Sequence, residues 1–212
     1  DYVRYWLHNG MLTMGGEKMS KSVGNVQKVR ELAKRHSGEV LRYALLGGQY
    51  RSPLAWGDDV LRQAKASLDT LYQALRDNPD SEHQAPDYTT WRLDQFPQAA
   101  VNALCDDLNT PLAQSVLHEF AGRLQRGQDD EARSDLLAAS WLLGLLDQDP
   151  ETYFKGTAEL EVSSQDIDAL IMSRNNARAA KNYALADKVR DELIALGIEL
   201  EDTREGTRWR RR

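Results

Sequence analysis

Residues 15–25 read Gly15-Gly16-Glu17-Lys18-Met19-Ser20-Lys21-Ser22-Val23-Gly24-Asn25, and this stretch decides how the rest of the chain is interpreted. Two lysines and two serines lie between glycines, without helical or strand periodicity. Because glycine tolerates positive φ, we expect a mobile loop that carries two cations and two hydroxyl groups. A lysine ammonium on a flexible stem suits a phosphate partner. The stretch is not a Walker A loop, because no glycine precedes a Gly-Lys-Ser/Thr triplet at the required spacing.

Residues 18–22 spell Lys-Met-Ser-Lys-Ser and resemble the second signature of class I aminoacyl-tRNA synthetases. Four flanking segments resemble one family of that class, the cysteinyl-tRNA synthetases: residues 5–10, 41–43, 50–54 and 206–211. The resemblance covers essentially all 212 residues, in the family's order. The plainer alternative is a solvated basic loop without a function, and the flanks argue against it.

The resemblance implies a cysteine–tRNA ligase, which activates cysteine with ATP and magnesium and then transfers it to tRNA(Cys). It implies that ATP is bound by Lys18, Met19, Ser20, Lys21 and Ser22. Lys21 is expected to contact ATP directly and Lys18 to support it, so these two are the catalytic candidates. The family's His-Ile-Gly-His-type motif and zinc site are not found in these residues. We therefore expect a carboxyl-terminal portion of the enzyme that holds no metal and is inactive without its amino-terminal half.

Charge is distributed unevenly along the chain, whose net charge is −6. Residues 1–65 carry 11 Lys and Arg against 6 Asp and Glu. Residues 66–162 carry only 6 Lys and Arg against 18 Asp and Glu. Residues 163–212 carry 10 Lys and Arg against 9 Asp and Glu, and several of the arginines lie at the end of the sequence. A polyanion would therefore contact both ends of the chain and avoid the middle. Acidic helices that keep the middle in solution would give the same pattern.

Cys105 is the only cysteine, which excludes an internal disulfide and a cysteine-rich zinc site within this sequence. It lies among Val101, Leu104 and Leu108 at helical spacing, so we predict a small core residue. The longest apolar stretch, residues 136–146, is too short to span a bilayer. We expect no membrane partner, a monomer, and a location in the reducing cytoplasm.

The expected fold is mainly α, with a small α/β unit at the carboxyl end. The predicted division is the end of a class I nucleotide-binding catalytic domain at residues 1–25, a helical stem-contact region at 26–78, a DALR-type helical bundle at 88–147 and an anticodon-binding domain at 163–212. Residues 78–90 and 148–162 are rich in turn-forming residues and are interpreted as linkers.

The stem-contact region is predicted to contain three helices. Asn25 is expected to cap the first, which runs to Arg35, and Ser37 the second, which ends at Gly47. A strongly amphipathic pattern predicts a long helix over residues 58–77. The resemblance makes Arg42 and Arg51 candidates for contacts with tRNA phosphates; surface arginines without a partner are the alternative.

The bundle is predicted to contain helices at about residues 94–108, 110–125 and 129–146. Thr110 and Pro111 are expected to serve as the N-cap and first-turn proline of the second helix. Asp106 and Asp107 are adjacent and point to different sides of a helix, so we interpret them as solvated rather than as a metal pair. His118 is likewise interpreted as solvated rather than as a metal ligand.

The terminal unit is predicted to contain helices over residues 164–181 and 183–196, followed by strands at 198–201 and 207–210. Tyr183, Asp187 and Arg190 recur at i, i+4 and i+7, so one helical face presents an aromatic ring, an acceptor and a cation. These groups can stack a splayed base and bond its edges. An ordinary exposed helix face is the alternative, and the terminal segment 206–211 argues against it. Arg174 lies on the preceding helix. The resemblance places tRNA contacts at Arg178, Tyr183, Asp187, Arg190, Asp202 and Trp209, the last as a stacking surface.

Three other functions remain open at this point. A tRNA-binding module without catalysis would require the Lys-Met-Ser-Lys-Ser loop to be vestigial. The related ligase of mycothiol synthesis joins cysteine to an amino sugar and lacks an anticodon-binding domain. Residues 163–212 therefore argue against this function. A plain helical interaction protein explains the bundle but neither signature.

Overall fold

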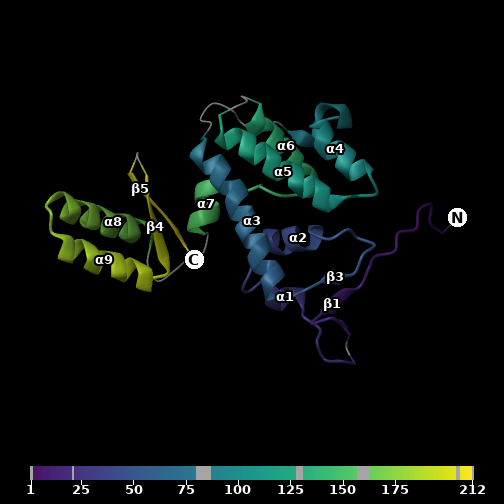
Figure 1. Cartoon of the computed structure of the whole chain (residues 1–212), viewed down its shortest axis with the longest axis horizontal. Coiled ribbons are helices and arrows are strands. Elements are labelled where there is room, and N and C mark those ends of the chain that lie inside the picture. Colours follow the sequence, from purple (N-terminus) through teal and green to yellow (C-terminus); the bar gives the residue numbers. More distant parts are fainter. Residues whose placement is uncertain are drawn as a thin grey trace. The chain divides into compact units, whose positions relative to one another are not determined.

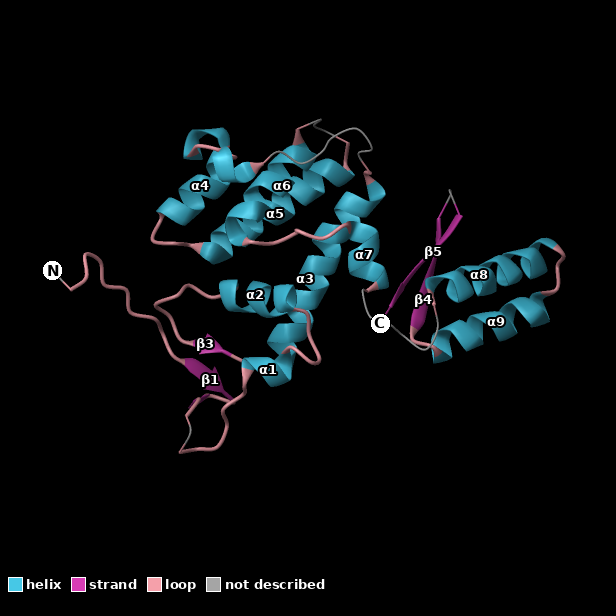
Figure 2. Cartoon of the chain, turned by 180° about the vertical axis from the view of Figure 1, so that it is seen from behind, coloured by secondary structure: helices cyan, strands magenta, loops and turns pink. Residues whose placement is uncertain are grey.

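The computed structural model describes residues 2–20, 22–79, 87–127, 131–156, 163–203 and 206–211. The chain forms two compact units, residues 1–147 and 148–212 (Figure 1). Helices make up most of both units (Figure 2), which confirms the mainly α fold class. In the described ranges no helix is both long enough and apolar enough to cross a membrane.

A three-stranded sheet with the order β2-β1-β3 begins the first unit. β1 (Leu12–Met14) pairs antiparallel with β2 (Glu17–Lys18) and parallel with β3 (Leu54–Ala55). Gly15 and Gly16 make the turn between β1 and β2 at φ values of +57° and +85°. A two-residue hairpin turn favours such left-handed residues. The sequence predicts a loop without strand structure here, and the hairpin corrects that prediction: the loop begins only after β2.

α2 (Gly38–Leu46) and α3 (Asp58–Asp77) confirm two of the predicted helices. Ser37 caps α2, because its hydroxyl oxygen accepts a hydrogen bond from the backbone N–H of Val40 at 3.2 Å. α3 packs against α2 and α5. It buries the predicted apolar stripe, whose members include Leu61, Ala64, Leu68, Leu71, Tyr72 and Leu75.

α1 (Val29–Leu32) is much shorter than the helix predicted from Asn25 to Arg35. Its N-cap residue, Lys28, makes no capping hydrogen bond with its side chain. Asn25 instead binds backbone groups of the preceding loop. Because the expected cap is used elsewhere, only one helical turn forms.

The bundle consists of 3₁₀ turns at Tyr88–Thr90 and Leu93–Gln95, followed by α4 (Gln98–Cys105), α5 (Thr110–Gln125) and α6 (Ala132–Leu143). α4 is shorter at both ends than the predicted helix 94–108, because Pro97 stands at its N-cap and Asp107 has a positive φ. The cap of α5 is Asn109, one residue before the predicted Thr110. α6 ends at Gly144 in the left-handed conformation, with φ +64°.

Two side chains of the bundle differ from their predicted environments. Cys105 is exposed rather than buried, because it is the last residue of α4. His118 is half-buried rather than solvated, and its Nε2 lies 2.9 Å from the hydroxyl of Tyr43 on α2. Burial lowers the pKa of His118 and raises the pKa of Tyr43, whose hydroxyl hydrogen bond with Ser67 acts in the opposite direction.

The second unit contains α7 (Pro150–Lys155), α8 (Ser164–Ala179), α9 (Tyr183–Ala195), β4 (Ile198–Thr203) and β5 (Gly206–Arg211). Both predicted helices and the antiparallel hairpin are confirmed. Ser163 caps α8 in a capping box with Asp166, one residue before the predicted Ser164. α7 lies within the predicted linker 148–162 and packs against β5, so part of that linker is an element of this unit. The core contains Ile167, Ile171, Val189, Leu193, Ile198 and Trp209.

Candidate active-site loop and nucleic-acid interface

One side chain, Asn25, closes the loop that follows β2. Its Oδ1 accepts a hydrogen bond from the N–H of Ser20 at 2.8 Å, and its Nδ2 donates to the carbonyl oxygen of Lys18 at 3.4 Å. The Ser20 hydroxyl oxygen lies 3.1 Å from that of Ser22 and accepts from the N–H of Val23 at 3.4 Å. The sequence pattern missed this role of Asn25, because asparagine is also a favoured helix cap.

The sheet anchors the same loop through Met19, whose N–H donates to the carbonyl oxygen of Leu12 at 3.0 Å. Lys18 and Ser22 are exposed, whereas Met19 and Ser20 are half-buried. Lys21 lies outside the residues that the structure describes. The described part of the loop thus presents an ammonium and a hydroxyl group at the surface, which are groups that bind phosphate oxygens.

Arg51 is held by Asp107, which comes from the turn between α4 and α5. The guanidinium lies 3.0 Å from both carboxylate oxygens, and the Tyr50 hydroxyl donates to Oδ1 at 2.8 Å. The hydrogen bonds from Tyr50 and then Arg51 lower the pKa of Asp107. Asp107 and Leu108 have φ values of +51° and +54°, which non-glycine residues seldom adopt. Asp107 is exposed, as the sequence predicts for a solvated carboxylate, and it is also the ion-pair partner of Arg51.

Arg42, the other candidate for phosphate contact, lies on α2 and donates from Nη1 to the carbonyl oxygen of Gly144 at 3.2 Å. Neither arginine is thus a surface cation without a partner. Gly10 binds the segment next to Arg51, because its N–H donates a hydrogen bond to the carbonyl oxygen of Tyr50 at 2.6 Å. A Cβ at this position would lie 2.1 Å from the carbonyl oxygen of Ser52, so the close approach requires glycine.

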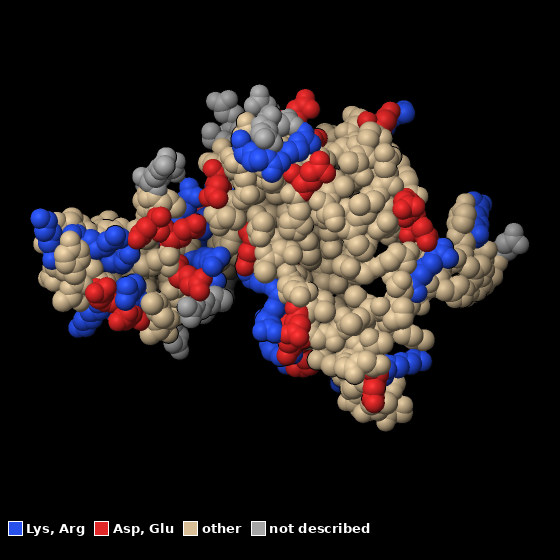
Figure 3. Space-filling view, viewed as in Figure 1, with Lys and Arg blue, Asp and Glu red and all other residues tan. Residues whose placement is uncertain are grey.

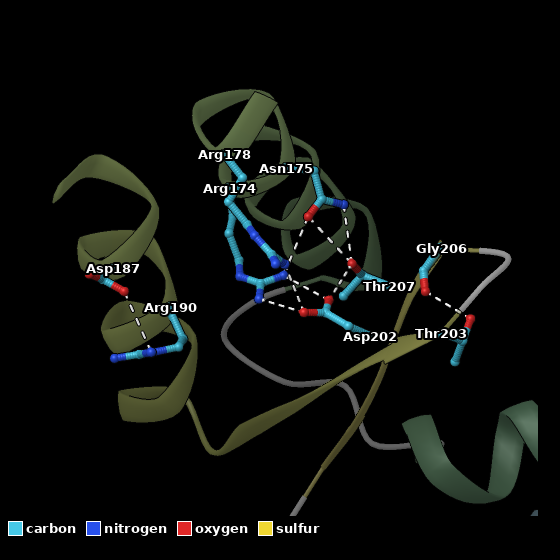
Figure 4. Close-up of polar contacts among 9 residues, drawn as sticks. All are labelled: Arg174, Asn175, Arg178, Asp187, Arg190, Asp202, Thr203, Gly206 and Thr207. Atoms are coloured by element: carbon cyan, nitrogen blue, oxygen red, sulfur yellow. Dashed lines mark hydrogen bonds and ion pairs between the residues drawn. The ribbon is translucent and has the colours of Figure 1, made fainter. Parts of the chain in front are cut away.

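In the second unit, Asp202 joins α8 to the β4–β5 hairpin (Figure 4). Arg174 donates to its two oxygens at 3.0 and 2.9 Å, and Arg178 donates to Oδ2 at 2.8 Å. The Thr207 hydroxyl donates to Oδ1 at 2.8 Å and lies 3.2 Å from Nδ2 of Asn175. The pKa of Asp202 lies far below its ordinary value, chiefly because Arg174 donates to the carboxylate, with smaller contributions from Thr207 and Arg178.

α9 presents the predicted group of an aromatic ring, an acceptor and a cation. Tyr183, its first residue, is 62% exposed. Asp187 and Arg190 lie on the same helix with 3.5 Å between carboxylate and guanidinium (Figure 4). The pKa of Arg174 is raised chiefly by its hydrogen bond to Asp202 and also by the nearby charge of Asp187.

Trp209 does not form the exposed stacking surface that the sequence predicts, since only 2% of the residue is exposed. Its Nε1 donates to Oδ1 of Asp168 on α8 at 2.8 Å. The cationic groups of Lys155 and Arg211 lie 5.4 and 5.7 Å from its ring centre. Trp209 is a core residue, because the alternation of β5 turns this position inward, opposite Leu200 on β4.

The charged residues form mixed groups rather than one basic surface on the face drawn in Figure 3. Much of that face of the first unit is uncharged. Among the described residues, no three His, Cys, Asp or Glu side chains are grouped so that they could hold a metal ion. The candidate groups for contact with a polyanion lie in two parts of the chain: the loop after β2, and the surface formed by α8, α9 and the hairpin.

Three family models match the chain. The model for the class I tRNA synthetase (C) catalytic domain matches residues 1–66, and the DALR domain matches residues 101–148. The model for the cysteinyl-tRNA ligase anticodon-binding domain matches residues 163–210. The matches follow one another along the chain and include both local groups described above.

Curated relatives are similar over nearly the whole chain. The cysteine–tRNA ligase of Saccharophagus degradans is 46% identical over 216 residues, which cover 100% of this chain and 46% of the relative. That of Paramagnetospirillum magneticum is 47% identical over 215 residues, covering 99% of this chain and 46% of the relative. The cysteine–tRNA ligase of Maricaulis maris is 46% identical over 212 residues, which cover 98% of this chain and 44% of the relative.

The chain spans somewhat less than half the length of these relatives. The similarity nevertheless extends over both units and over the residues of both candidate sites. The chain belongs to the cysteine–tRNA ligase family of class I tRNA synthetases and matches the portion of that family that carries the anticodon-binding domain.

Proposed function

We propose that this chain supplies the Lys-Met-Ser-Lys-Ser loop and the tRNA-binding part of a cysteine–tRNA ligase. The observation that carries the proposal is the loop of residues 18–22, which stands within the match to a class I catalytic domain and precedes an anticodon-binding domain. The chain spans less than half of its relatives, so another part of the enzyme would supply the amino-acid pocket and any zinc site.

In the proposed reaction, a carboxylate oxygen of cysteine attacks the α-phosphorus of ATP. A bond forms between them, the bond from that phosphorus to the bridging oxygen breaks, and pyrophosphate leaves. A ribose hydroxyl at the 3′ end of tRNA(Cys) then attacks the cysteinyl carbonyl carbon, losing its proton, and AMP leaves. Negative charge builds on the phosphate oxygens in the first step, where fixed cations stabilise it most effectively.

Lys18 and Lys21 are assigned to this charge, Lys21 by direct contact with ATP and Lys18 in support. Met19, Ser20 and Ser22 complete the ATP-binding loop. ATP enters as its magnesium complex, and no metal is assigned to the described residues.

The remaining candidates are assigned to tRNA(Cys). Arg42 and Arg51 are proposed to contact phosphates of the stem. Tyr183, with 62% of its surface exposed, is proposed to stack on an anticodon base. The anticodon surface comprises Arg178, Tyr183, Asp187, Arg190 and Asp202.

The functional division is proposed to follow residues 1–25, 26–78, 88–147 and 163–212. α7 joins the last of these regions through its contact with Trp209. We also propose a monomer that acts in the cytoplasm, where the exposed Cys105 would remain a thiol.

The substitution Lys21→Ala, made in a complete ligase that carries this chain, tests the proposal. Cysteine-dependent exchange between ATP and pyrophosphate should slow by about 10²-fold, a typical effect of losing one group that stabilises transition-state charge. The affinity for tRNA(Cys) should stay constant. Unchanged exchange would remove the catalytic assignment and favour the alternative, a tRNA-binding module without catalysis.

A further inference from the structure

The carboxylate of Asp202 has no free acceptor position. Arg174 and Thr207 donate to Oδ1 at 3.0 and 2.8 Å, and Arg174 and Arg178 donate to Oδ2 at 2.9 and 2.8 Å (Figure 4). An ionised carboxylate offers about four lone-pair positions, so these four bonds saturate it. Yet 45% of the Asp202 side chain is exposed, so an RNA base can approach it. A base N–H that bonds to this carboxylate must therefore replace one of the protein's own donors.

The donors differ in how easily they can be replaced. The Arg174 side chain is 10% exposed and binds both oxygens at once, in the paired geometry that makes arginine–carboxylate contacts strong. Thr207 lies on the hairpin, where Asn175 also holds its hydroxyl. The Arg178 side chain is 50% exposed and makes a single hydrogen bond to the carboxylate. Exposed ion pairs contribute little to stability, whereas breaking a buried pair leaves an uncompensated charge.

We propose that Arg174 is the positioning residue of the anticodon surface, and that an RNA base displaces Arg178, but not Arg174, from Asp202. In the free protein, Arg178 occupies the Oδ2 position that a base N–H takes in the complex. The displaced guanidinium then contacts a neighbouring phosphate. Arg174 keeps the carboxylate in place throughout the exchange. This inference rests on the proposed function, because it assumes that the surface reads an anticodon.

The experiment uses the whole chain and two RNA stem-loops, one with the cysteine anticodon and one with a single anticodon base changed. Arg174→Lys keeps the positive charge but loses the bidentate pair of hydrogen bonds to the Asp202 carboxylate. It should lower the preference for the cysteine anticodon by about tenfold, the usual size of one specific base contact. It should also raise the pKa of Asp202, as measured by carboxyl NMR titration.

The matched variant is Arg178→Gln. It should weaken the binding of both RNAs by the same factor and reduce the magnitude of the salt slope by about one, because one phosphate contact is lost. The preference between the RNAs should persist. In the parent, RNA should shift the guanidinium NMR signals of Arg178 and leave those of Arg174 unchanged.

The Nε1–H signal of Trp209, which reports its contact with Asp168, checks that each variant is folded. Should Arg174→Lys fail this check, Thr207→Val removes one fixed donor without changing charge and should also reduce the anticodon preference. A full preference in a folded Arg174→Lys or Thr207→Val protein, or an Arg178–Asp202 pair that persists in the complex, would overturn the inference. A parent chain with no preference between the RNAs would overturn the proposed function itself.

Discussion

Asn25 and Asp202 perform similar tasks in the two units. Asn25 joins the backbone at Ser20 to the carbonyl oxygen of Lys18, and Asp202 joins Arg174 to the hairpin. Each side chain fixes the groups around it, and Asp202 is in addition proposed to bond to an RNA base. Their substitution should therefore change the geometry of a site while its cations remain present.

Asn25→Ala should slow cysteine activation in the complete ligase by about tenfold, because Ser20 and Lys18 lose the side chain that joins them. Asn25→Asp is the matched control. It retains an acceptor for the N–H of Ser20 and should be less affected. ATP–pyrophosphate exchange measures both variants. Equal rates for the parent and Asn25→Ala would show that the loop does not depend on this side chain.

Asp202 should make the stability of the second unit depend on pH. Its pKa is lower in the folded chain than in the unfolded chain, chiefly because of Arg174. Below about pH 4 the unfolded chain therefore binds more protons, so the free energy of unfolding falls as the pH falls. Between about pH 5 and 3, the free energy of unfolding measured with denaturant should fall less for Asp202→Asn than for the parent. Identical losses in the two proteins would contradict the assigned cause.

At the scale of elements, strong periodicity is sufficient for prediction. α3 follows from its long amphipathic stripe, and the β4–β5 hairpin follows from alternation around a turn. α1 and α4 were predicted too long. Asn25 can cap a helix or close a loop, and only the fold decides between these uses. Pro97 is visible in the sequence, but the pattern could not show that a 3₁₀ turn precedes it.

The candidate sites were predictable to a similar extent. Motif residues such as Lys18 and Tyr183 are candidates because their chemistry is visible in the sequence. The partners of Arg51 and Asp202 could not be found in the same way, because they come from elements distant in the chain. Trp209 was assigned to the wrong environment, because alternation along β5 shows two faces without showing which one is buried.

Gly144 allows a left-handed end of α6 next to Arg42. Gly144→Ala should cost about 1–2 kcal/mol through its positive φ, and it should also displace the Arg42 side chain. Gly127→Ala is the matched control, because φ is +60° there and the space for a Cβ is open. The first variant should be less stable than the second by about 1 kcal/mol, the value of a hydrogen bond, as measured by urea unfolding. Equal effects would show that the Arg42 contact adds nothing to stability.

At the scale of the whole molecule, the proposed binding of RNA has to occur despite a net charge of −6. Its acidic middle segment, residues 66–162, carries most of the negative charge. The proposed contacts lie outside this segment: Lys18 and Arg51 precede it, and the anticodon surface follows it. The proposed RNA contacts therefore follow from the distribution of charge along the sequence rather than from the total charge.

The central claim is that this chain completes a ligase specific for cysteine and tRNA(Cys). The most direct test joins the chain to the upstream half of the Saccharophagus degradans relative and measures the transfer of radiolabelled cysteine to tRNA. The account predicts charging of tRNA(Cys), with kcat/KM lowered by about tenfold or more when one anticodon base is changed. Charging that ignores the anticodon, or no charging by a folded hybrid that binds tRNA(Cys), would contradict the account.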